Sequence, residues 1–291
     1  MSLSFTKDAG ALNQPSNAPH RRVLITGAAG RIGSKLAQHL QGRHDLRLMV
    51  RGDEDRIEQI RPLGEIVTAN LSDLSRLKEA CRGMDTVVHL AATPDSSAVW
   101  NTLLHDNIIG TYHLLAAAKA AGCRRVIFAS SVHAVGGYPP AVQVKTTDPV
   151  NPGDLYGVSK CFGESLGRYM AEQEGLSVIA LRIGAFQPVD AARRPEMIGV
   201  AEMFVSEHDL AQLIERCIDD TTLRWAVFHA VSNNRFQRLD MTDARELLGY
   251  RPQDDFTELS PAFKDLHLAE HLHTGSLRDK GQRSGLREEI Q

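Results

Sequence analysis

The sequence predicts an α/β fold in which a doubly wound parallel sheet is covered by helices on both faces. Three observations support this prediction. Short apolar runs alternate with amphipathic stretches of helical spacing, each run is nearly continuous in apolar residues, and the first run ends in a glycine-rich turn. With 291 residues, 42% hydrophobic and 24% charged, the chain has the composition of an ordinary globular protein.

Seven apolar runs are predicted to form the strands, because each is short and is bounded by polar or turn-forming residues. The run at Ile66–Val67 is the weakest of them, since it has two residues. In chain order the predicted strands are Val23–Thr26, Leu46–Val50, Ile66–Val67, Thr86–Leu90, Arg125–Ser130, Ser177–Leu181 and Ala226–Val231.

The stretches between these runs are predicted to be helices, because their apolar residues recur every three or four positions. The clearest is Thr111–Ala121, which is rich in alanine and leucine and ends at a glycine. The predicted helices are Ser34–Leu40, Leu74–Cys81, Thr111–Ala121, Val158–Glu174, Glu207–Asp219 and Met241–Leu248.

The domain organisation follows from where this regular alternation holds. Residues 21–185 carry it and are predicted to form a Rossmann-type core. Residues 186–273 are less regular and are predicted to be a small region, interleaved with the core, that covers a substrate site. Residues 1–20 and 274–291 are polar and are predicted to be tails without regular structure.

Charge and composition exclude several function classes. Lys+Arg total 33 and Asp+Glu 36, so a net charge of −3 gives no general attraction to nucleic acid or to an anionic membrane. No run approaches the ~20 apolar residues of a membrane span, and the first twenty residues lack the apolar core of a signal peptide. The four cysteines form no CxxC pair. We therefore expect a cytoplasmic protein with free thiols.

The glycines of TGAAGRIG point to a dinucleotide. Gly27, Gly30 and Gly33 lie between a predicted strand and a predicted helix, where they permit a tight turn, a close approach of backbone to pyrophosphate, and close helix packing. The amides at the helix N-terminus would face the phosphates. The alternative interpretation is a glycine-rich turn that holds no ligand.

Tyr156 and Lys160 form a second candidate constellation. They are four residues apart, so they lie on one face of a helix, where an ammonium would lower the pKa of a phenol and let Tyr156 act as a general base. Ser130 and Ser131 end the fifth predicted strand, at the sheet edge where such folds bind ligands. The alternative for these serines is a hydroxyl that caps its own turn.

Taken together, TGxxGxxG, HLAA (His89–Ala92), NIIGT (Asn107–Thr111), FASS (Phe128–Ser131) and YGVSK (Tyr156–Lys160) resemble the extended short-chain dehydrogenases/reductases over residues 21–185. The longer stretches NIIGTYHLL, VIFASSVHAVGGYP and LYGVSKCFGE are similar to bacterial uronate dehydrogenases.

The resemblance implies a role for each matching residue. Tyr156 would remove the proton of the substrate hydroxyl, and Lys160 would hold the nicotinamide ribose. Ser131 would hydrogen-bond the reacting hydroxyl, and Asn107 would support the lysine and a relay water. Arg194 would bind the carboxylate of the substrate, with its neighbour Arg193 as the alternative, because a guanidinium donates two parallel hydrogen bonds.

His133 would contact substrate or simply pack. The cofactor, NAD or NADP, would lie against the glycines and the residues that match the family's cofactor positions. These further residues are Arg31, Ile32, Arg51, Asn70, Leu71, Leu90, Ala91, Ala92, Asn107, Ser130, Tyr156, Lys160 and Ile183.

The chain departs from uronate dehydrogenases at positions that affect specificity. Val132 and Ala185 replace an asparagine and a serine, which makes the pocket more apolar. The second strand ends in Val50-Arg51, where NAD-preferring relatives have an acidic residue. Arg51 could accept the 2′-phosphate of NADP, whereas Asp53 or Asp55 could reach back to the ribose of NAD. The choice between the two cofactors stays open.

The function implied is oxidation of C1 of a hexuronate (glucuronate or galacturonate) to an aldarolactone. Three alternatives stay open: a nucleotide-sugar epimerase or dehydratase, a carbonyl reductase of the same superfamily, and a non-catalytic dinucleotide sensor. The 25 residues between Arg182 and His208 are few for a nucleotide-sugar insert. No metal site is predicted, since His267, His271 and His273 lack a carboxylate pattern. By resemblance, a homodimer would form through the helices at 111–121 and 158–174.

Overall fold

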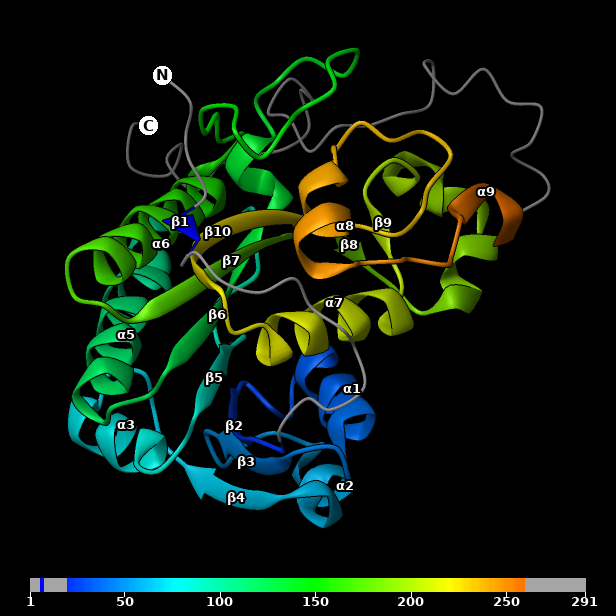
Figure 1. The fold of residues 1–291 in the computed structure, drawn as a ribbon. Coiled ribbons are helices and arrows are strands. Elements are labelled where there is room, and N and C mark those ends of the chain that lie inside the picture. Colours follow the sequence, from blue (N-terminus) through cyan, green and yellow to red (C-terminus); the bar gives the residue numbers. More distant parts are fainter. Residues whose placement is uncertain (1–5, 8–19, 260–291) are drawn as a thin grey trace.

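The computed structural model describes residues 6–7 and 20–259 of the 291-residue chain. Its main sheet has eight strands in the order β1-β10-β7-β6-β5-β2-β3-β4, and seven of them are parallel (Figure 1). The predicted doubly wound parallel sheet is therefore confirmed. The strands are β1 Thr6–Lys7, β2 Arg22–Thr26, β3 Asp45–Val50, β4 Glu65–Thr68, β5 Thr86–His89, β6 Arg125–Ser131, β7 Ser177–Ile183 and β10 Leu223–Ala230.

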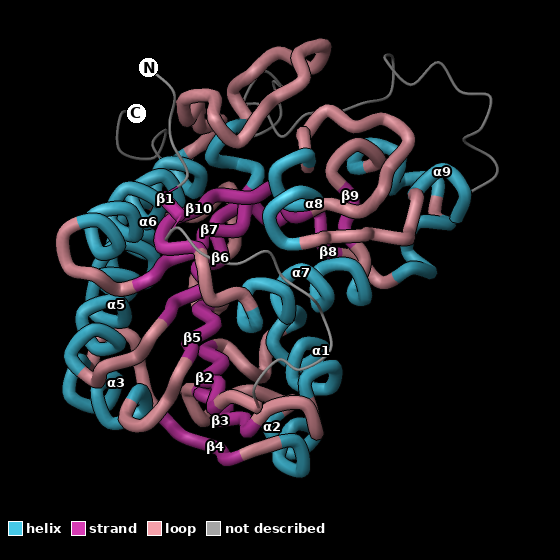
Figure 2. The backbone as a smooth tube through the Cα atoms, viewed as in Figure 1, coloured by secondary structure: helices cyan, strands magenta, loops and turns pink. Residues whose placement is uncertain are grey.

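Helices cover both faces of this sheet (Figure 2). One face carries α3, α5 and α6, and the other carries α1 and α7, which pack against each other. The helices are α1 Arg31–Leu40, α2 Ile57–Ile60, α3 Leu74–Cys81, α4 Trp100–Leu103, α5 Gly110–Ala120, α6 Leu155–Glu172, α7 Glu207–Asp219, α8 Thr242–Leu248 and α9 Phe256–Leu259. Among the described residues, no helix is long and apolar enough to span a membrane.

Each of the seven parallel strands contributes residues to both cores, because successive side chains point to opposite faces of the sheet. In β2, Val23 and Ile25 pack into the core beneath α1 and α7, whereas Leu24 packs into the core beneath α3 and α5. This two-sided burial explains why the strand sequences are continuous in apolar residues.

The strand order reverses at β2. The chain runs outward from β2 through β3 to β4, and then returns to place β5 on the other side of β2. Open sheets of this type bind ligands beyond the carboxyl ends of the strands at such a reversal. The site is therefore expected between the loops that follow β2 and β5.

Several predicted bounds differ from the structure, as in α1, which begins at Arg31 and not at Ser34, and three of the differences have a clear physical reason. Thr6–Lys7, placed in a tail without structure, forms β1 antiparallel to β10, because the edge strand β10 offers unpaired backbone groups. The helix predicted from Val158 begins at Leu155, because Asp154 caps it by accepting the amide of Gly157 at 2.7 Å.

The third wrong boundary concerns the helix predicted at 111–121. That helix extends back through a π-helical segment, Leu104–Ile109, to α4. Asparagine, glycine and β-branched residues in this stretch have low helix propensity, so its sequence gives little sign of a helix.

The C-terminal part adds a two-stranded sheet of β8 Ala185–Phe186 and β9 Phe204–Val205. In Figure 1 these strands lie beside α8, beyond the carboxyl end of β7. A small separate core, which includes Phe204 and Phe256, holds this region together. The predicted tail at 274–291 lies outside the described residues.

Candidate active site

The glycine-rich turn after β2 has the shape of a phosphate cradle. Gly27 has a φ of +65°, and a Cβ there would lie 3.0 Å from the Ala91 backbone nitrogen. A Cβ on Gly33 would lie 2.3 Å from the Gly27 carbonyl oxygen. Gly30 is the N-cap of α1 and provides no side-chain cap, so the first amides of α1 are left for a ligand. These residues fit a dinucleotide.

Replacing Gly33 with alanine should damage this cradle. The added methyl group would overlap the Gly27 carbonyl and push α1 away from the turn. Such overpacking costs about 1–3 kcal/mol, so we expect NADH affinity to fall about tenfold or more. Fluorescence titration of NADH would measure the loss. Gln38→Ala, at an exposed position of the same helix, is the matched control, and equal affinities of the two variants would contradict this interpretation.

The ends of β2 and β5 are tied together beside the cradle. The Thr26 hydroxyl accepts the amides of Leu90 and Ala91 at 3.2 and 3.1 Å, and it pairs with the His89 ring at 2.9 Å. Burial lowers the pKa of His89 to about 3, so this ring is neutral. The predicted cofactor positions Leu90 and Ala91 are thus fixed next to Gly27.

Arg31, the first residue of α1, reaches the C-terminal region. Its Nη2 donates to the Phe186 carbonyl at 3.0 Å and to the Gln187 side chain at 3.1 Å. Arg31 was predicted to contact cofactor, and in the structure it joins the cradle to the strand β8.

The end of β3 holds an acidic residue that the sequence reasoning missed. The Glu54 carboxylate accepts the amide of Arg51 at 2.9 and 3.0 Å and that of Gly52 at 2.9 Å. The Arg51 side chain is exposed and lies 3.5 Å from Asp53. Glu54 is therefore a further acidic residue of the loop after β3, and its carboxylate closes that loop onto its own backbone. The sequence signal for this residue is the acidic run DED at residues 53–55.

Tyr156 lies in the first turn of α6, facing the carboxyl end of β6. It is 9% exposed and forms a side-chain hydrogen bond with Ser131, the last residue of β6. The His133 ring meets the Tyr156 ring edge-on, with 5.3 Å between centroids. Asp154, the N-cap of α6, also binds the His133 Nδ1 at 2.6 Å. The structure thus brings Ser131, His133 and Tyr156 together as predicted.

Lys160 lies one turn further along α6 and is 3% exposed. Its Nζ is 5.2 Å from the centre of the Phe128 ring and 5.5 Å from that of Tyr156. Burial lowers the pKa of Lys160 to about 7. Burial raises the pKa of Tyr156 to about 12, opposed by the Ser131 hydrogen bond and reinforced by Asp154. Burial is the largest of these effects, and Lys160 is not among the groups that shift the Tyr156 pKa. That Lys160 depresses this pKa when cofactor is bound, so that Tyr156 can act as the base, stays a prediction.

Asn107 sits in the π-helical segment and acts on α6 through a neighbour of Lys160. Its amide nitrogen donates to the Ser159 hydroxyl at 3.0 Å and to the Thr93 carbonyl at 3.1 Å. The Ser159 hydroxyl donates in turn to the Tyr156 carbonyl at 2.7 Å. Asn107 therefore positions the helix turn that carries both catalytic candidates, and π-helical turns are frequent at functional sites.

Of six further cofactor candidates, several are engaged in structural contacts. The Ser130 hydroxyl donates to Glu164 at 2.6 Å, and Glu164 is paired with the buried Arg182. The Asn70 side chain accepts the amide of Ser72 at 3.0 Å, and Leu71 is buried beside α5. Ile32 packs partly buried against the core, Ala92 is half-buried, and Ile183 ends β7.

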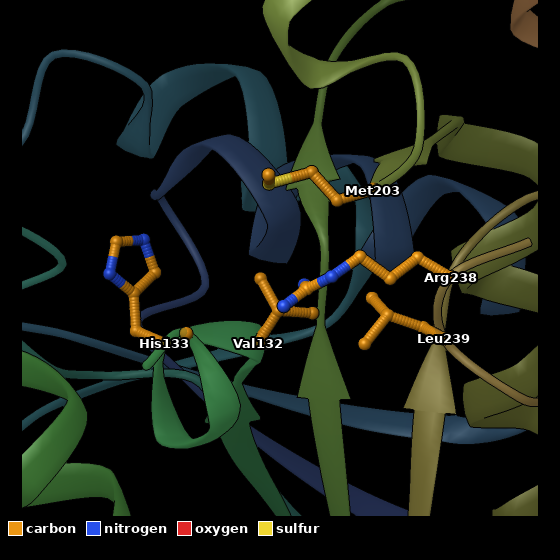
Figure 3. Close-up of a pocket in the computed structure, with 6 residues that line it drawn as sticks. Val132, His133, Met203, Arg238 and Leu239 are labelled. Atoms are coloured by element: carbon orange, nitrogen blue, oxygen red, sulfur yellow. The ribbon is translucent and has the colours of Figure 1, made fainter. Parts of the chain in front are cut away.

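A small pocket opens between the residues that follow β6 and the C-terminal region (Figure 3). Arg194 does not line it: this side chain and that of Arg193 are exposed. A different guanidinium, which the sequence reasoning did not single out, reaches into the pocket from the loop after β10. The lining residues are Val132, His133, Gly136, Met203, Arg238 and Leu239.

One group of side chains in the described part of the chain has the spacing of metal ligands. It consists of His208, Asp209 and Asp254. The buried Asp209 already accepts the amides of Gln253 and Asp254 and the Ser232 hydroxyl. Its carboxylate is thus occupied in fixing the chain after α8. The histidines at 267, 271 and 273 lie outside the described residues.

Comparisons with known proteins agree with this geometry. Residues 23–187 match the model of the NAD dependent epimerase/dehydratase family. An NAD-dependent glucose-6-phosphate dehydrogenase of Haloferax volcanii is 33% identical over 252 residues, which are 82% of this chain and 95% of that protein. An L-arabinose 1-dehydrogenase (NAD(P)(+)) of the same organism is 33% identical over 256 residues, 80% of this chain and 97% of that protein.

A solved structure shares the fold over most of both chains. A variant of the uronate dehydrogenase from Agrobacterium tumefaciens, complexed with NAD, is 31% identical and superposes with a TM-score of 0.74. The superposition covers 88% of this chain and 91% of that one.

Proposed function

Because the chain belongs to the NAD-dependent epimerase/dehydratase family, we propose that it is an NAD(P)-dependent sugar-acid dehydrogenase. The reaction is oxidation of C1 of a hexuronate to an aldarolactone, with Tyr156 as the general base. The observation that carries this proposal is the buried Tyr156–Ser131 pair at the carboxyl end of β6, in the same sheet edge as the glycine cradle.

The side chains divide the work on the reacting hydroxyl. Ser131 and Tyr156 would hydrogen-bond the C1 hydroxyl, and Tyr156 would take its proton as the C1–H bond breaks. When bound, the nicotinamide supplies the hydride acceptor. Asp154 and His133 hold the ring of Tyr156 from one side, and Asn107 fixes the helix turn through Ser159. Because these contacts hold the Ser131 and Tyr156 hydroxyls in place, the proton transfer would need no further search for the right orientation.

The site favours a monosaccharide over a nucleotide sugar. The pocket beside His133 is small and partly open to solvent. The segment between Arg182 and His208 is occupied by β8, β9 and two short 3₁₀ helices and adds no further domain.

A homodimer is part of the proposal. Large apolar side chains stay exposed on the two helices that were expected to pair. Tyr112 of α5 is 53% exposed, and Val158 and Tyr169 of α6 are 40% and 50% exposed. Aromatic side chains of this kind are enriched at subunit interfaces.

The proposal predicts which nicotinamide nucleotide is used. The backbone-held Glu54 would accept hydrogen bonds from ribose hydroxyls and repel a 2′-phosphate. We therefore expect purified protein to reduce NAD faster than NADP with glucuronate or galacturonate, measured as the appearance of reduced nicotinamide. Glu54→Gln should lower the NAD/NADP ratio of kcat/KM about tenfold.

The matched control is Glu58→Gln, which removes an exposed carboxylate from the neighbouring helix α2. A preference for NADP in the unmodified protein would instead assign the nucleotide choice to Arg51. An absence of turnover with both sugar acids, while NADH still binds, would contradict the proposed substrate.

A further inference from the structure

Arg238 is a buried cation at the substrate end of the pocket. It lies in the loop between β10 and α8, and its side chain is 8% exposed. Figure 3 shows its guanidinium pointing across the pocket toward Val132 and His133. His133 in turn stacks edge-on against Tyr156. The guanidinium therefore faces a pocket that is lined in part by His133, a direct neighbour of Tyr156.

The protein leaves much of this guanidinium without hydrogen bonds. Its Nη2 donates to the Tyr138 carbonyl at 2.8 Å. The Nη1 lies 3.7 Å from a Glu202 oxygen, which is too far for a hydrogen bond. The Nε is buried without a partner, and so is that Glu202 oxygen. Buried donors are usually satisfied, so a group from outside the protein is expected to complete the set.

The carboxylate of Glu202 neutralises the charge of Arg238 only in part. Glu202 is 2% exposed, and burial raises its pKa, opposed by the charge of Arg238. A carboxyl that takes up a proton more readily competes less well for the guanidinium. Glu202 therefore does not complete the hydrogen bonds of this guanidinium, which can accept an anionic partner from outside the protein.

We propose that Arg238 is the specificity residue that binds the carboxylate of the sugar-acid substrate, in the role expected of Arg194. This inference rests on the proposed function. Arg194 is exposed and does not line the pocket, whereas Arg238 reaches into it. A guanidinium can hold a carboxylate through two parallel hydrogen bonds, and a site that is partly desolvated strengthens such a pair.

The test compares glucuronate with glucose, which differ in whether C6 is a carboxylate or a hydroxymethyl group. Arg238→Met should raise KM for glucuronate about 10- to 100-fold, the loss of a charged hydrogen bond. KM for glucose should change less than about threefold. For Arg238→Lys, KM for glucuronate should lie between that of the unmodified protein and that of Arg238→Met. Arg194→Met is the matched control and should leave both values unchanged.

Two results would overturn the inference: an equal rise in KM for both sugars, or a rise that appears with Arg194→Met and not with Arg238→Met. NADH affinity and melting temperature check that the variants fold, because Arg238 also holds the Tyr138 carbonyl. Failure of the proposed function is a separate outcome, seen as no turnover of either sugar acid by the unmodified protein.

In that case, calorimetry of glucuronate binding to the NADH-loaded protein tests whether Arg238 binds the carboxylate, independently of turnover. Binding that is lost in Arg238→Met and kept in Arg194→Met would support the inference. Binding that does not depend on Arg238, or no binding at all, would overturn it.

Discussion

Replacing Tyr156 with phenylalanine should lower kcat about 10²- to 10⁴-fold, or below detection, while NADH affinity stays within about twofold. The ring keeps its edge-on contact with His133, and only the hydroxyl that bonds Ser131 is lost. The cradle for the dinucleotide lies on the separate turn after β2, which this change does not touch. Steady-state kinetics and NADH fluorescence titration measure the two effects on the same preparation.

The chain contains a matched control for this experiment. Tyr112→Phe removes a hydroxyl from a tyrosine that is 53% exposed on α5 and should leave kcat unchanged. If the Phe variant at 156 kept near-normal turnover, Tyr156 would not be the base. A parallel loss of NADH affinity would mean that the hydroxyl acts in binding and not in proton transfer.

The parts of the fold that could be predicted are those fixed by local sequence. Strand β6, with its continuous run from Val126 to Phe128, is buried on both faces, as the strands of a parallel sheet covered by helices commonly are. The glycine cradle was also predictable, because Gly27 and Gly33 meet steric requirements within one turn. These features need no knowledge of distant residues.

The parts that could not be predicted depend on residues far apart in the chain. Arg238 reaches the carbonyl of Tyr138, one hundred positions away, and Arg31 reaches that of Phe186. Nothing near either arginine in the sequence indicates its partner. The family resemblance pointed to Arg194, yet the loop conformation leaves that side chain exposed.

Electrostatics gave the least predictable result, because the sign of a pKa shift depends on burial as well as on neighbours. The spacing of Tyr156 and Lys160 indicates that they share a helix face, and they do. Spacing does not reveal that both are enclosed, so that desolvation drives both groups toward their neutral forms. The lysine is therefore held at an energetic cost to the folded protein.

Replacing Lys160 with methionine should abolish turnover and yet raise the melting temperature of the cofactor-free protein at pH 6–7. The folded pKa of Lys160, about 7, lies below the ~10.4 of an unfolded lysine, so its cost is complete at and below pH 7 and disappears as pH rises toward 10. A gain of about 1 kcal/mol would raise the melting temperature by roughly 2–4 °C. Differential scanning calorimetry from pH 6 to pH 10 measures it. If the rise in melting temperature did not shrink as pH increases, it would not come from removal of a buried charge. A lower melting temperature of the variant at pH 6–7 would mean that Lys160 stabilises the fold.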